Sequence, residues 1–90
     1  MEINKKEVIK NLINWRKDLE NNPDEIQLKL QIFLDNFKIQ DNNLQDFHFT
    51  HTVHKELSYI IDHLKEKGKW RISSAISHFD GLLNYIPKLI

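Results

Sequence analysis

Residues 55–68 have the sequence KELSYIIDHLKEKG, and this stretch decides the fold. Its apolar residues recur at intervals of three and four positions, which places their side chains on one face of an α-helix. These residues are Leu57, Ile60, Ile61 and Leu64. Charged residues cover the rest of the helix, and Gly68 follows its last turn, where a left-handed C-terminal cap is expected. We therefore expect the rest of the chain to pack against this apolar face.

The composition is typical of one small helical domain. With 90 residues, positions 1–90 can form a single hydrophobic core and no second one. Hydrophobic residues make up 40% of the chain, and Gly and Pro occur only twice each, which favours helices over a turn-rich β fold. Thirteen basic residues balance thirteen acidic ones. This neutral charge argues against general binding to nucleic acids or to anionic membranes.

The sequence predicts a cytoplasmic protein. Its start lacks the apolar segment of a signal peptide, and no apolar run approaches the ~18 residues of a transmembrane helix. The absence of Cys excludes disulfides, cysteine nucleophiles and thiolate metal sites. Lys outnumbers Arg, Asn and Ile are abundant and Ala occurs once, which hints at a bacterial or phage source with an AT-rich genome.

Capping residues mark two helices in the first half of the chain. Asn4 has the place of an N-cap, with Glu7 three residues later as in a capping box. Asn22 and Pro23 end the first helix and begin the second, because Pro is well tolerated at the first helical position. Two helices joined by so short a turn should lie antiparallel.

Residues 26–34 carry two competing patterns. Helical spacing relates Ile26, Leu30, Phe33 and Phe37, whereas the run Ile-Gln-Leu-Lys-Leu-Gln-Ile alternates as a half-buried strand does. A helix is favoured, because the start signal belongs to a helix and no neighbouring hairpin turn supplies a partner strand. The alternative is an α+β fold with a short hairpin built from residues 26–34 and 47–53.

A third helix should begin near residues 41–43 (Asp-Asn-Asn) and continue into the stretch quoted above. Phe47, then Thr50 or His51, and His54 would extend the same apolar face towards the N-terminus. The β-branched and aromatic residues of this segment are poor helix formers, so frayed or extended first turns are expected.

A fourth helix should follow Gly68, with Ser73 or Ser74 near its N-cap and Pro87 at its end. The expected architecture is a small antiparallel four-helix bundle, all-α, in one domain. The residues expected in its core are Leu12, Trp15, Leu30, Phe33, Leu57, Ile61, Leu64, Ile76, Phe79 and Leu83.

Three histidines, His48, His51 and His54, form the first candidate site. Imidazole is a common metal ligand, but steps of three turn the outer two side chains about 120° apart on a helix. No carboxylate stands at a suitable helical spacing beside them. We therefore expect no metal and no cofactor, and keep a metal site on these three residues as the alternative.

Arg71 and His78 form the second candidate site. They are seven residues apart, which is two helical turns, so both side chains should point the same way. An arginine can stabilise a phosphate and a histidine can transfer a proton. The pair resembles the arginine-then-histidine spacing of HEPN-type helical ribonucleases, whose motif lies in a dimeric cleft. Ile72 departs from the polar residue that usually follows the arginine. The resemblance covers one helix and implies a dimeric ribonuclease or an inactive relative.

Basic residues at positions 65, 67, 69 and 71 surround Trp70, as they do where single-stranded nucleic acids bind. Glu66 interrupts this set, and Lys near a helix C-terminus is ordinary dipole complementation. Nucleic-acid binding is therefore not expected.

Several apolar residues find no place on the four helix faces: Leu28, Ile32, Ile39, Phe49, Tyr85, Leu89 and Ile90. Small proteins leave some apolar surface wet, but a large exposed patch indicates a partner. We interpret all of these except Phe49 as a partner-binding surface, either for a target protein or for self-association. The sequence therefore favours a small helical protein acting by protein–protein interaction, such as a regulator, an antitoxin- or immunity-type inhibitor, or a phage-encoded antagonist. An enzyme is less favoured, with the HEPN-like ribonuclease as the alternative.

Overall fold

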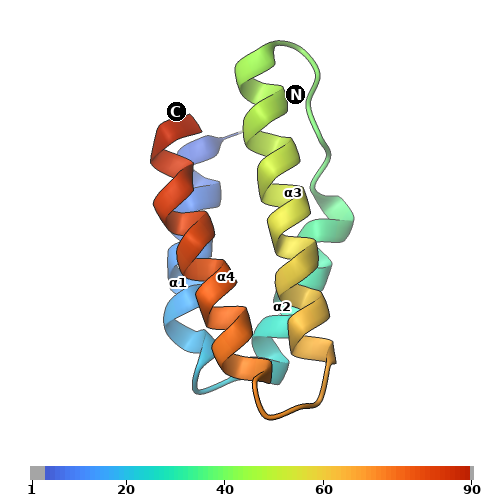
Figure 1. The fold of residues 1–90 in the computed structure, drawn as a ribbon. Helices are drawn as coiled ribbons and strands as arrows, with labels where there is room; N and C mark the ends of the chain where they lie inside the picture. Colours follow the sequence, from blue (N-terminus) through green and yellow to red (C-terminus); the bar gives the residue numbers. More distant parts are fainter. Residues whose placement is uncertain (1–3, 90) are drawn as a thin grey trace.

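The structure is a computed structural model that describes the backbone of residues 4–89 and the side chains of residues 4–87. It contains four α-helices and a short 3-10 helix (Figure 1): α1 (Lys5–Leu19), α2 (Pro23–Asn36), α3 (Leu44–Lys65), α4 (Arg71–Tyr85) and η1 (Ile86–Leu89). The described part of the chain contains no strand. The predicted all-α fold is therefore confirmed.

The alternative α+β fold is wrong, because both segments of its hairpin are helical. Residues 26–34 lie within α2 and residues 47–53 within α3. The start signal of α2 outweighs the alternating pattern: Pro23 occupies the start of the helix, and Asp24 and Glu25 follow in its first turn. Carboxylates there interact favourably with the positive end of the helix dipole.

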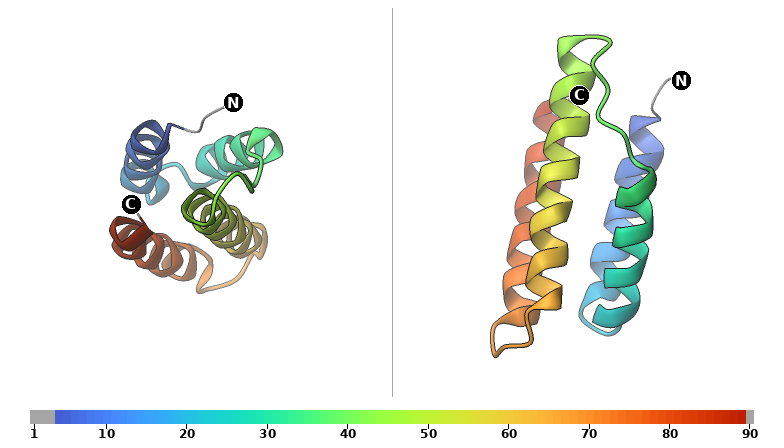
Figure 2. Two further views of the ribbon diagram at one scale, coloured as in Figure 1. Left: turned by 90° about the horizontal axis from the view of Figure 1, so that it is seen from above. Right: turned by 90° about the vertical axis from the view of Figure 1, so that its right-hand side faces the viewer.

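The four helices surround a common core, and helices that follow one another in the chain run in opposite directions (Figures 1 and 2). α3 packs most extensively against α4 and next against α2, whereas α1 lies against α4 and α2. α3 is thus the helix around which the bundle is organised, as residues 55–68 predicted. Although α3 has 22 residues, no described helix is both long and apolar enough to cross a membrane.

α3 supplies the largest share of the core, with seven buried residues: Phe49, Thr50, Val53, Leu57, Ile60, Ile61 and Leu64. The predicted extension of its apolar face is correct at the position given as Thr50 or His51, where Thr50 is buried, and wrong at Phe47 and His54. Phe47 and His51 are exposed, and His54 is half-buried.

The difference follows from the rotation of about 100° per residue along an α-helix. Stepping back from Leu57 by four residues, twice, reaches Val53 and Phe49, which lie on the side where Ile60 also lies. Phe47 lies on the other side of Leu57, at the solvent-exposed edge of the helix. Phe49, which had no place on the predicted faces, is fully buried.

All ten residues predicted for the core are buried or partly buried. Six of its members are buried: Leu12, Leu30, Leu57, Ile61, Leu64 and Phe79. Four are partly buried and pack against the core: Trp15, Phe33, Ile76 and Leu83.

Asparagine caps start two of the helices. The side chain of Asn4 accepts a hydrogen bond from the backbone N–H of Glu7 at 3.1 Å. Asn43 accepts one from the N–H of Asp46 at 2.8 Å. This second cap explains why the expected fraying of α3 is wrong: the helix is regular from Leu44 onward. A side-chain cap satisfies an N–H that the first turn leaves without an intrahelical partner.

The turn between α3 and α4 differs from the prediction. Gly68 is not left-handed, because the chain leaves α3 through Glu66, whose backbone is extended. α4 begins at Arg71 rather than at a serine cap, and the N–H of Ser74 donates to the carbonyl of Trp70 at 2.8 Å. The N-cap is Trp70, three or four residues earlier than Ser73 or Ser74 suggested.

Two ion pairs tie α1 to its neighbours. Lys5 lies 3.0 Å from Asp46 of α3, and Nε of Arg16 donates to Asp80 of α4 at 2.6 Å. The hydrogen bond to Asp80 raises the pKa of Arg16. Surface pairs of this kind contribute about 0–1 kcal/mol, so the apolar core accounts for most of the stability.

Candidate functional site

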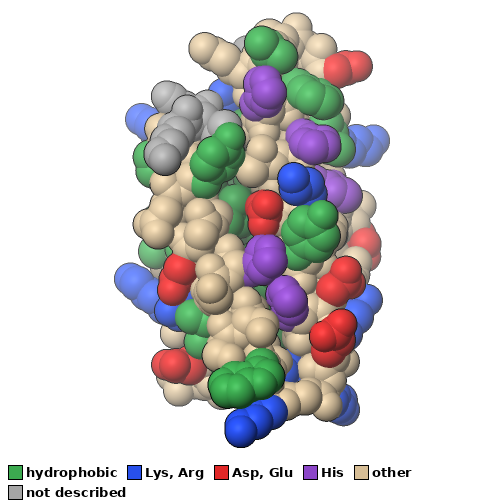
Figure 3. All heavy atoms as spheres, viewed as in Figure 1, with side chains coloured by type: hydrophobic (Ala, Val, Ile, Leu, Met, Phe, Trp, Pro, Cys, Tyr) green, Lys and Arg blue, Asp and Glu red, His purple; other side chains and the backbone are tan. Residues whose placement is uncertain are grey.

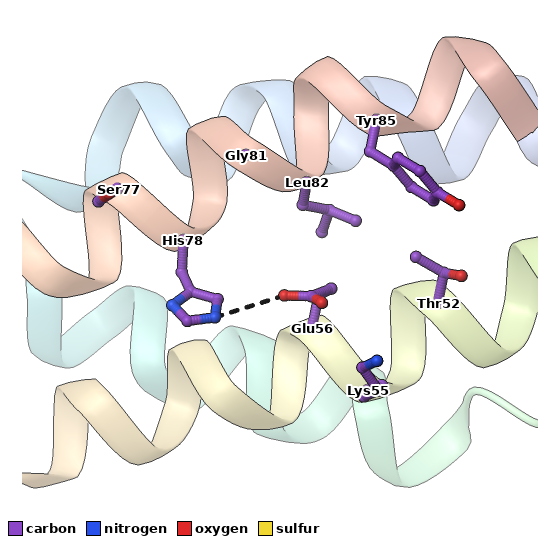
Figure 4. Close-up of a pocket in the computed structure, with 8 residues that line it drawn as sticks. All are labelled: Thr52, Lys55, Glu56, Ser77, His78, Gly81, Leu82 and Tyr85. Carbon is purple, nitrogen blue, oxygen red and sulfur yellow. Dashed lines mark ion pairs between the residues drawn. The ribbon is translucent and has the colours of Figure 1, made fainter.

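A groove of about 520 Å³ runs between α3 and α4 and is open to solvent (Figure 4). Its lining comes from both helices: Thr52, Lys55 and Glu56 from α3, and Ser77, His78, Gly81, Leu82 and Tyr85 from α4. The groove is thus bordered by an imidazole, a carboxylate, an ammonium group and several hydroxyls.

His78 reaches from α4 to a row of side chains on α3. Glu56, Tyr59 and His63 follow one another at intervals of three and four, so they share one face of that helix. Nε2 of His78 lies 3.5 Å from the Glu56 carboxylate, and Nδ1 lies 3.2 Å from Nε2 of His63. The rings of Tyr59 and His78 have their centres 5.6 Å apart. Both ring nitrogens of His78 are therefore engaged by its own chain.

We did not predict this row from the sequence, although its residues have the same kind of helical spacing as Arg71 and His78. Glu56 and His63 are seven residues apart, as Arg71 and His78 are. What the sequence lacked was the register of α4 against α3, which sets His78 opposite this row.

Arg71 has different neighbours from His78. Its Nε donates to the backbone carbonyl of Leu64 at the end of α3, and its Nη2 donates to Asp24 of α2 at 2.6 Å. The hydrogen bond and the charge of Arg71 lower the pKa of Asp24. The Arg71 side chain is only 17% exposed. The arginine therefore ties three helices together, while His78 interacts with α3, so the structure does not bring the two into one polar cluster.

The three histidines of the first candidate site lie along α3, and Figure 3 shows histidines distributed over the face formed by α3 and α4. His48 and His51 are exposed, and their rings pack near Phe47, with centres 6.0 and 5.4 Å from it. Within residues 4–89, no group of three or more His, Asp or Glu side chains could hold one metal ion.

The outer side of α2 carries two of the predicted partner-binding residues. Leu28 is 61% exposed and Ile32 is 56% exposed, one helical turn apart. Ile26 and Leu30 are buried on the opposite side of the same helix. We call Leu28 and Ile32 the α2 outer face.

The other predicted partner-binding residues do not extend this face. We expected Ile39 to continue the side of Leu28 and Ile32 further along the same helix, but α2 ends at Asn36 and Ile39 lies in the segment before α3, so this expectation is wrong. Tyr85 lines the α3/α4 groove and is 48% exposed. The side chain of Leu89 and the whole of Ile90 lie outside the described residues.

No protein-family model matches the chain, and no significant match was found among curated proteins or solved structures. The functional argument therefore rests on the surfaces described above.

Proposed function

We propose that this protein works by binding another protein through the α2 outer face. The observation that supports the proposal is the exposure of Leu28 and Ile32, each more than half accessible to water, on a helix that also buries its opposite side. A helix with apolar residues on two opposite sides suits a position between the chain's own core and a partner. Regulators, antitoxin- or immunity-type inhibitors and phage-encoded antagonists, in a bacterial or phage cytoplasm, are the classes that this mode of action fits.

Polar pairs border the α2 outer face on both sides. Glu25 and Lys29 form an ion pair at 3.1 Å along one edge. Gln31 donates to Asp35 at 2.9 Å along the other. Protein interfaces typically combine an apolar centre with a polar rim of this kind. The pairing also satisfies these groups before a partner arrives, which lowers the cost of bringing an apolar surface against them.

The energy available from the α2 outer face sets the size of the contact. Burying an exposed Leu or Ile side chain contributes roughly 1.5–3 kcal/mol. A micromolar complex requires about 8 kcal/mol. Leu28 and Ile32 can therefore anchor a complex, while surrounding residues must supply the rest of the contact.

Sedimentation of tag-free protein tests the proposal. If the wild type self-associates, the Leu28→Lys, Ile32→Lys double variant should be monomeric with its helical circular dichroism signal intact. If the wild type is monomeric, the same comparison is made for binding to the product of the neighbouring gene, because antitoxins and immunity proteins are commonly encoded beside their targets. Leu44→Lys is the matched control, since Leu44 is 70% exposed at the start of α3. It should leave association unchanged.

Two outcomes would contradict the proposal. One is a monomeric wild type that does not bind the neighbouring gene product, combined with a double Lys variant that unfolds. Both side chains would then belong to the chain's own core. The other is association that survives the double variant but is lost in Leu44→Lys, which would move the contact to α3.

The HEPN-like ribonuclease has weaker support. Arg71 donates to Leu64 and Asp24, while both nitrogens of His78 are engaged by other side chains. Catalysis would require both residues to leave these partners. RNA cleavage that is abolished by His78→Ala, with the fold intact, would favour the ribonuclease over protein binding.

A further inference from the structure

Two histidines from neighbouring helices meet at the edge of the α3/α4 groove. Nε2 of His63 and Nδ1 of His78 are 3.2 Å apart, and the ring centres are 5.0 Å apart with the planes inclined by 44°. Zinc–nitrogen bonds measure about 2.0–2.1 Å, so two nitrogens bound tetrahedrally to one ion lie about 3.3 Å apart. The two imidazoles thus already have the separation of two ligands of a single ion.

Glu56 adds the feature that usually accompanies a metal-binding histidine. Its carboxylate lies 3.5 Å from Nε2 of His78, the nitrogen that does not face His63. A carboxylate that accepts the N–H of a ligating ring fixes the tautomer that leaves the other nitrogen free to coordinate. Glu56 takes this role when the 3.5 Å contact shortens to hydrogen-bond distance. With Nε2 protonated, the lone pair of His78 is on Nδ1, facing His63.

We propose that His63 and His78 bind a divalent transition-metal ion of the Zn²⁺, Ni²⁺ and Cu²⁺ class. Imidazole nitrogen suits these ions, whereas Mg²⁺ and Ca²⁺ prefer oxygen ligands. Each ring binds the ion as a neutral imidazole, His63 through Nε2 with its proton on Nδ1 and His78 through Nδ1 with its proton on Nε2. His78 is 38% exposed, so an ion from solvent can reach it. No third protein ligand joins the pair within the described residues, so water completes the coordination and binding is reversible.

The proposal is separate from the sequence-based expectation of no metal, which concerned His48, His51 and His54. Those residues lie on a single helix, where two successive steps of three turn the outer two side chains about 120° apart. They therefore provide a matched control: His51→Ala, His54→Ala removes as many imidazoles as His63→Ala, His78→Ala does.

Titration calorimetry of tag-free protein with NiCl₂, and then with ZnCl₂, tests the site. The wild type and His51→Ala, His54→Ala should each bind one ion per chain with the same affinity. The His63→Ala, His78→Ala variant should lose this binding. Glu56→Gln should weaken it by about 10–100-fold, as removal of a carboxylate partner of a ligating histidine does elsewhere.

A second measurement needs no variant and stays informative if a substitution disturbs the fold. In NMR spectra of the histidine rings, Zn²⁺ should shift Nε2 of His63 and Nδ1 of His78 far more than any nitrogen of His48, His51 or His54. The proposal is overturned if the wild type binds no ion, if binding survives His63→Ala, His78→Ala in a folded protein, or if the shifts fall on the other histidines.

Discussion

α3 and α2 are both rich in apolar residues, but only α3 buries most of them. α3 contributes seven buried residues over 22 positions, whereas α2 buries Ile26 and Leu30 over 14. The difference lies in their neighbours: α3 makes the two most extensive helix contacts, with α4 and α2, and α2 has its main contact with α3. The spacing of apolar residues and the capping signals therefore predict that a segment is a helix, while the extent of its contacts decides how much of it is buried.

The largest effect on the free energy of unfolding should come from comparing two phenylalanines of α3, one on its buried side and one on its exposed side. Phe49 is fully buried and Phe47 is 39% exposed, two residues apart in one helix. Phe49→Ala should lower the free energy of unfolding by about 3–5 kcal/mol, because it leaves a large cavity. Phe47→Ala should cost well under half as much, because water already reaches that ring. Urea unfolding measures both, and equal losses would mean that the inward face of α3 is misplaced.

A second pair compares α3 directly with α2. Ile61 is 2% exposed and Leu28 is 61% exposed. Ile61→Ala should lower the free energy of unfolding by about 2–5 kcal/mol, by loss of transfer energy and creation of a cavity. Leu28→Ala should change it by less than ~0.5 kcal/mol, as surface substitutions usually do. Thermal and urea unfolding provide the comparison. An Ile61→Ala loss below ~0.5 kcal/mol would place the core elsewhere.

Thr50 joins the segment after α2 to α3 and should give a smaller effect. Its hydroxyl accepts from the N–H of Gln40 at 2.8 Å and donates to the carbonyl of Asp46 at 2.8 Å, while the residue is fully buried. Thr50→Val keeps the shape and leaves the Gln40 N–H without this partner, which costs about 1–3 kcal/mol. Ser58→Ala is the control, because the Ser58 hydroxyl donates only to His54 within the same helix. Similar losses in the two variants would show that the link to Gln40 contributes nothing.

The smallest effect is expected where α2 and α4 are joined by Asp24 and Arg71. The pKa of Asp24 is lowered by Arg71, so folding favours the ionised carboxylate. A lowered folded-state pKa means that this contribution is fully present above the ordinary pKa of about 4 and is lost as pH falls through the folded value. Asp24→Asn should therefore be less stable than the wild type at pH 7, by less than any core variant, and equally stable near pH 2. A difference that persists in acid would assign the effect to something other than charge.

Local signals in the sequence were sufficient to predict where the helices lie in the chain, but not which of their side chains contact one another. Asn4 was recognised as a cap because a cap and its first turn lie within four residues, and the start of α3 was placed within residues 41–43 for the same reason. Pro23 was recognised for the same reason. The inward face of α3 before Val53 was not, because Phe47 and Phe49 are equally apolar and their burial depends on where neighbouring helices lie.

The candidate sites show the same limit. Leu28 and Ile32 could be predicted as exposed, since the periodicity of one helix places them opposite Leu30. The meeting of His63 with His78 could not, because it depends on the register between two helices. Arg71 shows the same limit. Its spacing to His78 suggested that both side chains point the same way, but its hydrogen bonds to Asp24 on α2 and to the Leu64 carbonyl on α3 determine its direction.

The central claim is that the side chains of the α2 outer face are exposed to solvent and contribute little to the stability of the bundle. The most direct test is the free energy of unfolding of the Leu28→Lys, Ile32→Lys double variant, measured in urea at a concentration where the wild type is monomeric. We predict a value within about 1 kcal/mol of the wild type, because the substituted positions are at the surface. A loss of several kcal/mol, comparable to that of Ile61→Ala, would contradict the account and place both residues in the core.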